Sequence, residues 1–177
     1  MTSLYNFCEY SPDWPREFDR EAARLRGYFH DEIIDIHHVG STSIPGLAAK
    51  AIIDLLPVVK NIEEADKLTP QLEKEGYRAW GEYGLSGRRF FTKDRNGYRT
   101  HNIHIYGDGN PDILRHVAFC AYLRVHEDDR REYEALKRAL FAKYPADIDR
   151  YTDGKTEFIT HLEPVAIDWY KQQKSTS

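Results

Sequence analysis

Cysteine is scarce in this sequence, and a long hydrophobic run is absent. Cys8 and Cys120 are the only two cysteines, and their separation matches no metal-binding spacing. No segment approaches the roughly 18 apolar residues that a membrane span needs. Residues 1–15 also lack the basic and apolar regions of a secretory signal. We therefore expect a cytoplasmic protein with free thiols and no membrane-spanning segment.

An excess of basic residues is missing as well. The 25 Lys and Arg residues are outnumbered by 29 Asp and Glu residues, which gives a formal net charge of −4. Nonspecific binding of nucleic acid requires a basic surface, so this charge balance carries no strong nucleic-acid signal, although it leaves room for a local basic pocket. The length, without repeats or flexible linkers, predicts one domain over residues 1–177.

Hydrophobic periodicity predicts an α+β protein with a small mixed β-sheet flanked by helices and a helical C-terminal half. Asn96-Gly97 is the strongest short signal for a β-hairpin turn, and the apolar run around Asp54 indicates a buried central strand. We expect Pro164 to kink the last helix and residues 171–177 to fray. The predicted elements are a helix at 12–29, a strand at 32–40, a short helix at 45–50, a strand at 51–59, a helix at 61–77, a hairpin at 87–107, and helices at 111–126, 129–144 and 154–173.

The least ordinary stretch is "HHVGSTSIPGLAAKAIIDLLPVV", residues 37–59. Gly40, Ser41 and Thr42 follow a predicted strand. If a helix begins after them, free backbone N–H groups and the helix dipole would form an anion site. The two hydroxyl groups add donors, and Lys50 would add a positive charge. The stretch matches neither a Walker A loop nor a nucleophile elbow, and a plain turn between two strands is an equally good interpretation.

Asp54 lies inside the apolar strand that follows this turn. A carboxylate there is costly unless it has a partner or a function. The partner is either a metal ion or a cation such as Lys50 or an arginine, while a local salt bridge behind a turn is the structural alternative. His37 and His38 alternate on the preceding strand, so at most one of them faces the site, and both are interpreted as mainly structural.

The strand "RTHNIHIY", residues 99–106, supplies a second candidate. Residues three apart on a strand face opposite sides, so His101 and His104 cannot both ligate one metal without a bulge. Asn102, His104 and Tyr106 share one face. A histidine that faces the Asp54 strand could be a metal ligand or a general acid or base. For a single histidine, however, a hydrogen-bonded structural role is the more common outcome.

Several basic residues of the predicted elements are interpreted as solvent-exposed. Arg88 and Arg89 alternate on the hairpin, so one of them could reach a phosphate, but a solvated position is favoured for each. Lys137 and Lys155 lie in helical segments that are otherwise full of surface charge, and we expect both to be solvated.

Long segments of the chain resemble the GrpB family. "HHVGSTSIPGLAAKAIIDLL" closely resembles the family signature, and the resemblance extends over about residues 9–170. It implies a fold similar to the nucleotidyltransferase superfamily. In that superfamily a Gly-Ser at a helix start holds nucleotide phosphates, and acidic residues on the next and a later strand hold divalent metal. The other similar segments are "YSPDWPREFDREAARL", "THNIHIY", "FCAYLRVHEDDRREYEALKRAL" and "YTDGKTEFITHL".

The resemblance matches Gly40 and Ser41 to the Gly-Ser and Asp54 to the first acid. It departs at Leu56, where the second acid should stand, and His104 lies on the strand where a later acid would be expected. Two metals about 4 Å apart need several bridging carboxylates, which one Asp cannot provide. The implied site therefore either uses one divalent cation, Mg²⁺ or another, held by Asp54 and His104, or binds a nucleotide without transferring it.

Three functions follow from this resemblance. The first is a nucleotidyltransferase-like enzyme that acts on a nucleotide or another phosphorylated small molecule. Ser41 and Thr42 would then hold phosphates, Lys50 would neutralise charge, and Asp54 would hold Mg²⁺.

The second function is a phosphate-binding module that has lost turnover because Leu56 replaces the second metal carboxylate. The third is a one-metal hydrolase with Asp54 and His104 as catalytic residues. A GrpB-like domain is also fused to dephospho-coenzyme A kinase in some proteins, which points to a nucleotide or coenzyme ligand by association alone.

Overall fold

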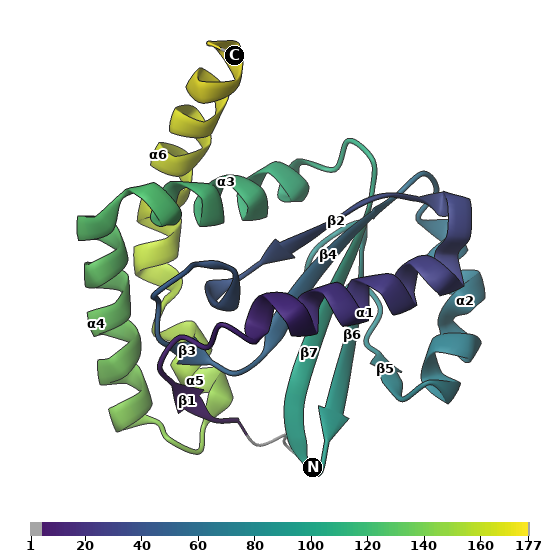
Figure 1. The fold of residues 1–177 in the computed structure, drawn as a ribbon, viewed down its shortest axis with the longest axis horizontal. Coiled ribbons are helices and arrows are strands. Elements are labelled where there is room, and N and C mark those ends of the chain that lie inside the picture. The colour runs from purple at the N-terminus through teal and green to yellow at the C-terminus, as the bar shows by residue number, and fades with distance from the viewer. Residues whose placement is uncertain (1–4, 177) are drawn as a thin grey trace.

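The computed structural model describes residues 5–176. Its centre is a five-stranded sheet in the order β2-β4-β7-β6-β5 (Figure 1). β4 and β7 run parallel, whereas every other pair of neighbours is antiparallel, so the predicted mixed sheet is confirmed. The strands are β2 (Ile33–Val39), β4 (Ile53–Val59), β5 (Tyr77–Ala79), β6 (Arg88–Arg95) and β7 (Tyr98–Gly107).

Helices cover both faces of this sheet. α1 and α2 pack on one face, where α1 crosses in the foreground of Figure 1. α3, α4 and α6 supply the apolar side chains that pack on the other face. None of the helices within residues 5–176 is both long and apolar enough to cross a membrane. The helices are α1 (Trp14–Phe29), α2 (Glu63–Lys74), α3 (Pro111–Val125), α4 (Glu127–Lys143), α5 (Ile148–Asp153) and α6 (Thr156–Ser175).

Strand β4 is buried from both sides, which explains its continuous apolar sequence. Leu55 packs in the core beneath α1 and α2, while Leu56 packs in the core beneath α3, α4 and α6. Both side chains are fully buried. Asp54, the second residue of β4, is the one carboxylate that this strand carries.

The predicted hairpin between β6 and β7 is confirmed. Arg95 pairs with Tyr98 across the turn. Asn96 and Gly97 between them have φ values of 54° and 81°. Two consecutive positive φ angles are the requirement of a type I′ turn, which Asn-Gly meets at low cost. This turn sets the register that brings residues of β7 beside β4.

Several parts of the chain differ from the prediction, and β1 (Phe7–Cys8), β5 and α5 were not predicted at all. Residues 45–50 do not form a short helix, because Gly46 has a φ of 80° and residues 49–50 pair as strand β3 (Ala49–Lys50) with β1. Only a one-turn 3₁₀ helix, η2 (Ser41–Ser43), follows Gly40. The predicted fraying of residues 171–177 is wrong up to Ser175, because α6 continues to that residue through Pro164.

Candidate functional site

A cavity of about 820 Å³ lies on the face of the sheet that α3, α4 and α6 cover. Side chains of β4, β6 and β7 form its floor, and its walls come from the η2 turn, the loop after β5, α3, α4 and the α5–α6 region. The structure brings all six residues that the sequence nominated to this one cavity. These residues are Gly40, Ser41, Thr42, Lys50, Asp54 and His104.

A row of paired residues crosses the sheet at this floor. Directly paired residues project from the same face. Neighbouring strands are about 4.8 Å apart, so three strand spacings separate Asp54 from Arg78, at the far end of the row, by roughly 14 Å. The row therefore gives the site a length suited to an extended ligand. In order of pairing, the row is Val39, Asp54, Asn102, Thr92 and Arg78.

Asp54 is held directly against the Gly40 turn. Gly40 has a φ of 70°, and a Cβ atom built there would lie 2.4 Å from Oδ2 of Asp54. Only glycine permits both this backbone conformation and this close approach. The glycine at position 40 therefore leaves room for the Asp54 carboxylate, whose Oδ2 atom points toward the turn.

Two side chains of β7 donate hydrogen bonds to the other oxygen of Asp54. Nδ2 of Asn102 donates to Oδ1 at 3.0 Å, and Nε2 of His104 lies 3.1 Å from the same atom. Burial alone would raise the pKa of Asp54, but the hydrogen bonds from His104 and Asn102 and the charge of Lys50 outweigh burial and lower it. Asp54 is therefore ionised at neutral pH.

Arg88 determines where His104 carries its proton. The Arg88 side chain is buried and donates to the carbonyl oxygens of Glu82 and Tyr83, and its Nη1 lies 3.3 Å from Nδ1 of His104. A guanidinium group can only donate, so Nδ1 of His104 accepts and the ring proton lies on Nε2, facing Asp54. The prediction that Arg88 is solvated is therefore wrong, because its donors are used inside the fold.

The donor set fits a two-metal site poorly. Leu56, at the position expected for a second acid, is fully buried in the core. His104 donates to Asp54 through Nε2 and accepts from Arg88 through Nδ1, so neither nitrogen offers a lone pair to a metal in this arrangement. No group of three or more His, Cys, Asp and Glu side chains within residues 5–176 is arranged to hold a metal ion.

The η2 turn lacks part of the predicted anion site. A three-residue 3₁₀ turn has no helix dipole of consequence, so the dipole contribution is missing together with the predicted helix. The hydroxyl of Thr42 lies 3.0 Å from Nε2 of His38, which in turn stacks on Phe18 of α1. Ser41 is partly buried at the cavity, and its hydroxyl hydrogen-bonds to the hydroxyl of Tyr133. The backbone N–H groups at the start of the turn are the donors expected for an anion there.

Three lysines line the cavity, and two of them contradict the predicted solvent exposure. Lys50 lies in β3, Lys137 in α4, and Lys155 directly before α6. Lys137 is only 1% exposed. The sequence contained a signal for this burial, because Lys137 lies four residues after the buried Tyr133 and therefore on the same side of α4. We nevertheless predicted a solvated position, because most neighbouring residues of this helix are charged.

An aromatic group flanks the Arg78 end of the floor. Nε1 of Trp80 donates to Oγ1 of Thr92 at 2.8 Å, and the guanidinium carbon of Arg78 lies 4.1 Å from the centroid of the Trp80 ring. Tyr83 stacks on Phe90 with the ring centroids 5.3 Å apart. Trp80 and Tyr83 belong to a loop without hydrophobic periodicity, so the sequence pattern did not nominate them.

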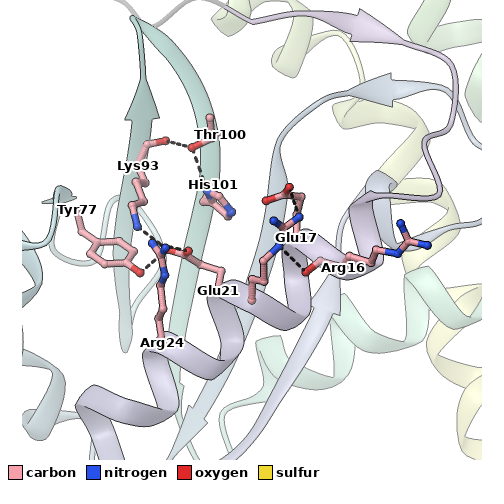
Figure 2. A network of polar contacts seen from close by, with 9 residues as sticks. Arg16, Glu17, Glu21, Arg24, Tyr77, Lys93, Thr100 and His101 are labelled. Atoms are coloured by element: carbon pink, nitrogen blue, oxygen red, sulfur yellow. Dashed lines mark hydrogen bonds and ion pairs between the residues drawn. The ribbon is translucent and has the colours of Figure 1, made fainter.

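A second buried carboxylate lies on the opposite face of the sheet, beneath α1 (Figure 2). Glu21 is 4% exposed and accepts hydrogen bonds from the hydroxyl of Tyr77 and, at 2.9 Å, from Nζ of Lys93. Arg24 lies 3.7 Å away on the same helix. None of these four residues lines the cavity. This cluster fastens α1 to β5 and β6 and has a structural role.

The fold is a nucleotidyltransferase-like α+β fold. The structure of Cid1 in complex with its short product ApU is similar with a TM-score of 0.51 at 15% identity, over 76% of this chain and 42% of that chain. At this identity the likeness concerns the fold alone, and it agrees with the fold class expected from the sequence.

The chain belongs to the GrpB family, because the family model described as "GrpB protein" matches residues 6–164. The crystal structure of the conserved protein GrpB from Enterococcus faecalis is similar with a TM-score of 0.88 and 42% identity, over 93% of this chain and 99% of that chain. UPF0157 protein YqkA from Bacillus subtilis is 45% identical over 168 residues, which cover 95% of this chain but only 49% of YqkA. The chain thus spans about half the length of that relative.

A relative named dephospho-CoA kinase, from Mycolicibacterium paratuberculosis, is 30% identical over 183 residues. The match covers 89% of this chain and 45% of that protein. The expectation that a domain of this kind occurs within proteins of that name is therefore confirmed.

Proposed function

We propose that this protein binds a nucleotide or another phosphorylated small molecule in the cavity beside Asp54. The observation that carries this proposal is the charge of the cavity in a chain whose formal net charge is −4. Six Lys and Arg side chains line the cavity against four Asp and Glu side chains. A locally cationic hollow concentrates anionic ligands. The cations are Lys50, Arg78, Arg99, Arg115, Lys137 and Lys155, and the acids are Asp54, Asp149, Asp153 and Glu163.

The aromatic end of the floor supports a nucleotide over a simple phosphate. Trp80 and Tyr83 present ring surfaces, and stacking on aromatic side chains is a common way to hold a base. Arg78 lies against Trp80 and could extend this platform. The separation of roughly 14 Å between Asp54 and Arg78, from three strand spacings, allows phosphates at one end and a base at the other.

Nucleotidyl transfer is the second candidate, and the nucleotidyltransferase-like fold favours it. Asp54 is the side chain that would hold one divalent cation, Mg²⁺ or another, through Oδ2, and such a cation would supply charge stabilisation to a phosphate. His104 could join as a ligand only after it released its hydrogen bond to Asp54 or to Arg88. A one-metal hydrolase with Asp54 and His104 requires the same rearrangement, so the present geometry favours binding over either reaction.

Calorimetric titration of the purified protein with ATP and with dephospho-coenzyme A, each with and without Mg²⁺, tests the proposal. The wild type and Asp54→Asn are compared, because the amide keeps an acceptor for Asn102 and His104 but removes the charge. Binding of either ligand without Mg²⁺ and in both proteins supports a binding module. Binding that needs Mg²⁺ and is lost in Asp54→Asn supports a metal-dependent enzyme and justifies assays for product.

Failure of every phosphorylated ligand to bind, with or without the metal, would contradict the proposal. Thermal unfolding of the same samples provides an independent readout. A ligand present at 100 times its dissociation constant stabilises the folded state by about 2.7 kcal/mol, which is measurable.

A further inference from the structure

The three cavity lysines come from separate parts of the chain, and two of them lie against one buried tyrosine. The Nζ atoms of Lys50 and Lys155 each lie 5.0 Å from the centroid of the Tyr151 ring. Lys137 reaches the same region from α4, where its Nζ donates to the carbonyl oxygen of Ala48 at 2.6 Å. An ammonium group has three donors, so this bond leaves two N–H groups of Lys137 for another partner.

These lysines have no carboxylate partner at ion-pair distance. Within residues 5–176 none of their Nζ atoms lies within 4.0 Å of an Asp or Glu oxygen. Lys93 on the opposite face shows the usual solution, with its Nζ 2.9 Å from Glu21. A buried cation without a paired anion is unfavourable, and a cluster of such cations more so. Burial of Lys137 and partial burial of Lys50 and Lys155 therefore disfavour the charged forms of these lysines, and a bound anion would favour them.

The electrostatics of the cluster agree with this geometry. Burial and the charge of Lys50 lower the pKa of Lys155 to about 7, although Asp54 acts in the opposite direction. Burial and the charge of Lys155 lower the pKa of Lys137 well below its usual range. The buried hydroxyl of Tyr151, whose ring lies near both Lys50 and Lys155, also has no hydrogen-bond partner in the described part of the chain.

The position of the cluster is built into the fold. Lys50 lies four residues before Asp54. Lys155 follows Gly154, where an added Cβ atom would meet Cδ2 of Leu140 at 2.3 Å. The lack of a side chain at Gly154 lets the chain before α6 pack tightly on α4, and this contact sets Lys155 beside the cavity.

We propose that Lys50, Lys137 and Lys155 form a subsite for a diphosphate or triphosphate group, next to the Gly40 turn. The inference rests on the proposed function, and it specifies that the phosphorylated ligand carries two or three linked phosphates. An anion with several charges favours the protonated form of several neighbouring lysines at once, which a single phosphate does to a smaller extent. The Tyr151 hydroxyl, which has no hydrogen-bond partner among the described residues, then donates to the same phosphate oxygens.

Calorimetric titration tests the subsite with phosphate, pyrophosphate, tripolyphosphate, AMP, ADP and ATP. Lys137→Met and Lys155→Met keep most of each side chain's length and apolar stem but remove its charge. Lys143→Met, an exposed position on the same helix as Lys137, is the matched control. Each Met variant also loses a mutual repulsion, so we expect it to fold, and thermal unfolding verifies this.

We expect tripolyphosphate and ATP to bind at least about tenfold more tightly than phosphate and AMP, because each charge-assisted hydrogen bond is a substantial contribution. Lys137→Met and Lys155→Met should each weaken the binding of ATP about tenfold, while Lys143→Met stays within about twofold of the wild type. Tighter binding of ATP than of tripolyphosphate would identify a nucleotide as the ligand, and equal binding would identify a polyphosphate without a base.

Equal affinity for AMP and ATP, unchanged in the Lys137 and Lys155 variants, would overturn the subsite but leave the proposed function intact for a monophosphate. Absence of binding for all six compounds would instead remove both the subsite and the function on which it rests.

Discussion

Each face of the central sheet carries a carboxylate at its interior, and the surroundings of these two carboxylates differ. Glu21, beneath α1, accepts hydrogen bonds from Tyr77 and Lys93, is 4% exposed and does not line the large cavity. Asp54, beneath the C-terminal helices, retains 22% of its side-chain exposure and lies in the floor of the large cavity. Both have a lowered pKa, because hydrogen bonds and nearby charges outweigh burial in each case.

The difference lies in the cations rather than in the carboxylates. On the α1 face, the lysine and the glutamate satisfy each other, so no ligand is needed. On the cavity face, three lysines line the site without an ion pair to any carboxylate of the described residues, and Asp54 accepts hydrogen bonds from Asn102 and His104 instead. A perturbed carboxylate is therefore a weak sign of function by itself. Unpaired cations at a cavity are the more informative sign here.

Removal of the closed carboxylate should have the largest effect on stability. Glu21→Ala leaves Lys93 and Tyr77 buried without their acceptor, so we expect a loss of about 3 kcal/mol in the free energy of unfolding, as for broken buried pairs. Urea unfolding measures this, with Asp19→Ala on the exposed side of α1 as the control. Ligand affinity should not change. A loss below about 0.5 kcal/mol, the range of ordinary surface substitutions, would show that the cluster is not structural.

Substitution of the turn glycine should have the next largest effect. Gly40→Ala places a Cβ atom against Oδ2 of Asp54 and strains a positive φ, so we expect a loss of about 2 kcal/mol together with displacement of the carboxylate. Gly46→Ala is the matched control, because Gly46 also has a positive φ but open space around it. Equal losses in the two variants would mean that the contact with Asp54 contributes nothing.

Lys155→Met should stabilise the free protein by about 1 kcal/mol, because it removes an unpaired, partly buried cation. The pKa of Lys155 is about 7 in the folded state and 10.5 ordinarily, so the unfolded state binds more protons between these values. Stability of the wild type should therefore rise with pH across that range, and the variant should show a smaller rise. Urea unfolding at several pH values provides the measurement. If Lys155→Met were less stable than the wild type, the claim that Lys155 has no stabilising partner would be contradicted.

Acid should lower the free energy of unfolding by a smaller amount through Glu21, on the α1 face. Hydrogen bonds from Tyr77 and Lys93 hold the pKa of Glu21 below its ordinary 4.5 in the folded state, against the effect of burial. The stability that this ionised group provides is present above 4.5 and is lost as the pH falls through the folded pKa. In Glu21→Gln this part of the acid dependence should disappear. An identical acid profile in both proteins would assign the loss to other carboxylates.

Much of the fold was predictable from local pattern. Asn96-Gly97 predicted the hairpin, and the apolar run around Asp54 predicted a buried central strand, because both signals depend on neighbouring residues. The β-strand period also predicted that Asn102 and His104 share one face. The helix expected at residues 45–50 failed because strand β3 depends on pairing with residues 7–8, more than 40 positions away, which no local pattern contains.

The cationic side of the cavity could not be predicted in the same way. Lys137 and Lys155 come from segments rich in surface charge. Contacts between distant residues place them at the cavity, because Lys137 donates to the carbonyl of Ala48 and Gly154 packs on Leu140. Arg88 was misjudged for a related reason, since its acceptors in the 82–83 loop are irregular backbone. Its neighbour Arg89 does face outward and pairs with the exposed Asp66 at 2.6 Å.

The most direct test compares ATP binding by calorimetry in three proteins under one buffer condition, the wild type, Glu21→Gln and Lys137→Met. We expect the wild type and Glu21→Gln to bind equally and Lys137→Met to bind about tenfold more weakly, because only the cavity face carries unpaired cations. Equal binding by Lys137→Met and the wild type, or loss of binding in folded Glu21→Gln, would contradict the assignment of function to the cavity face.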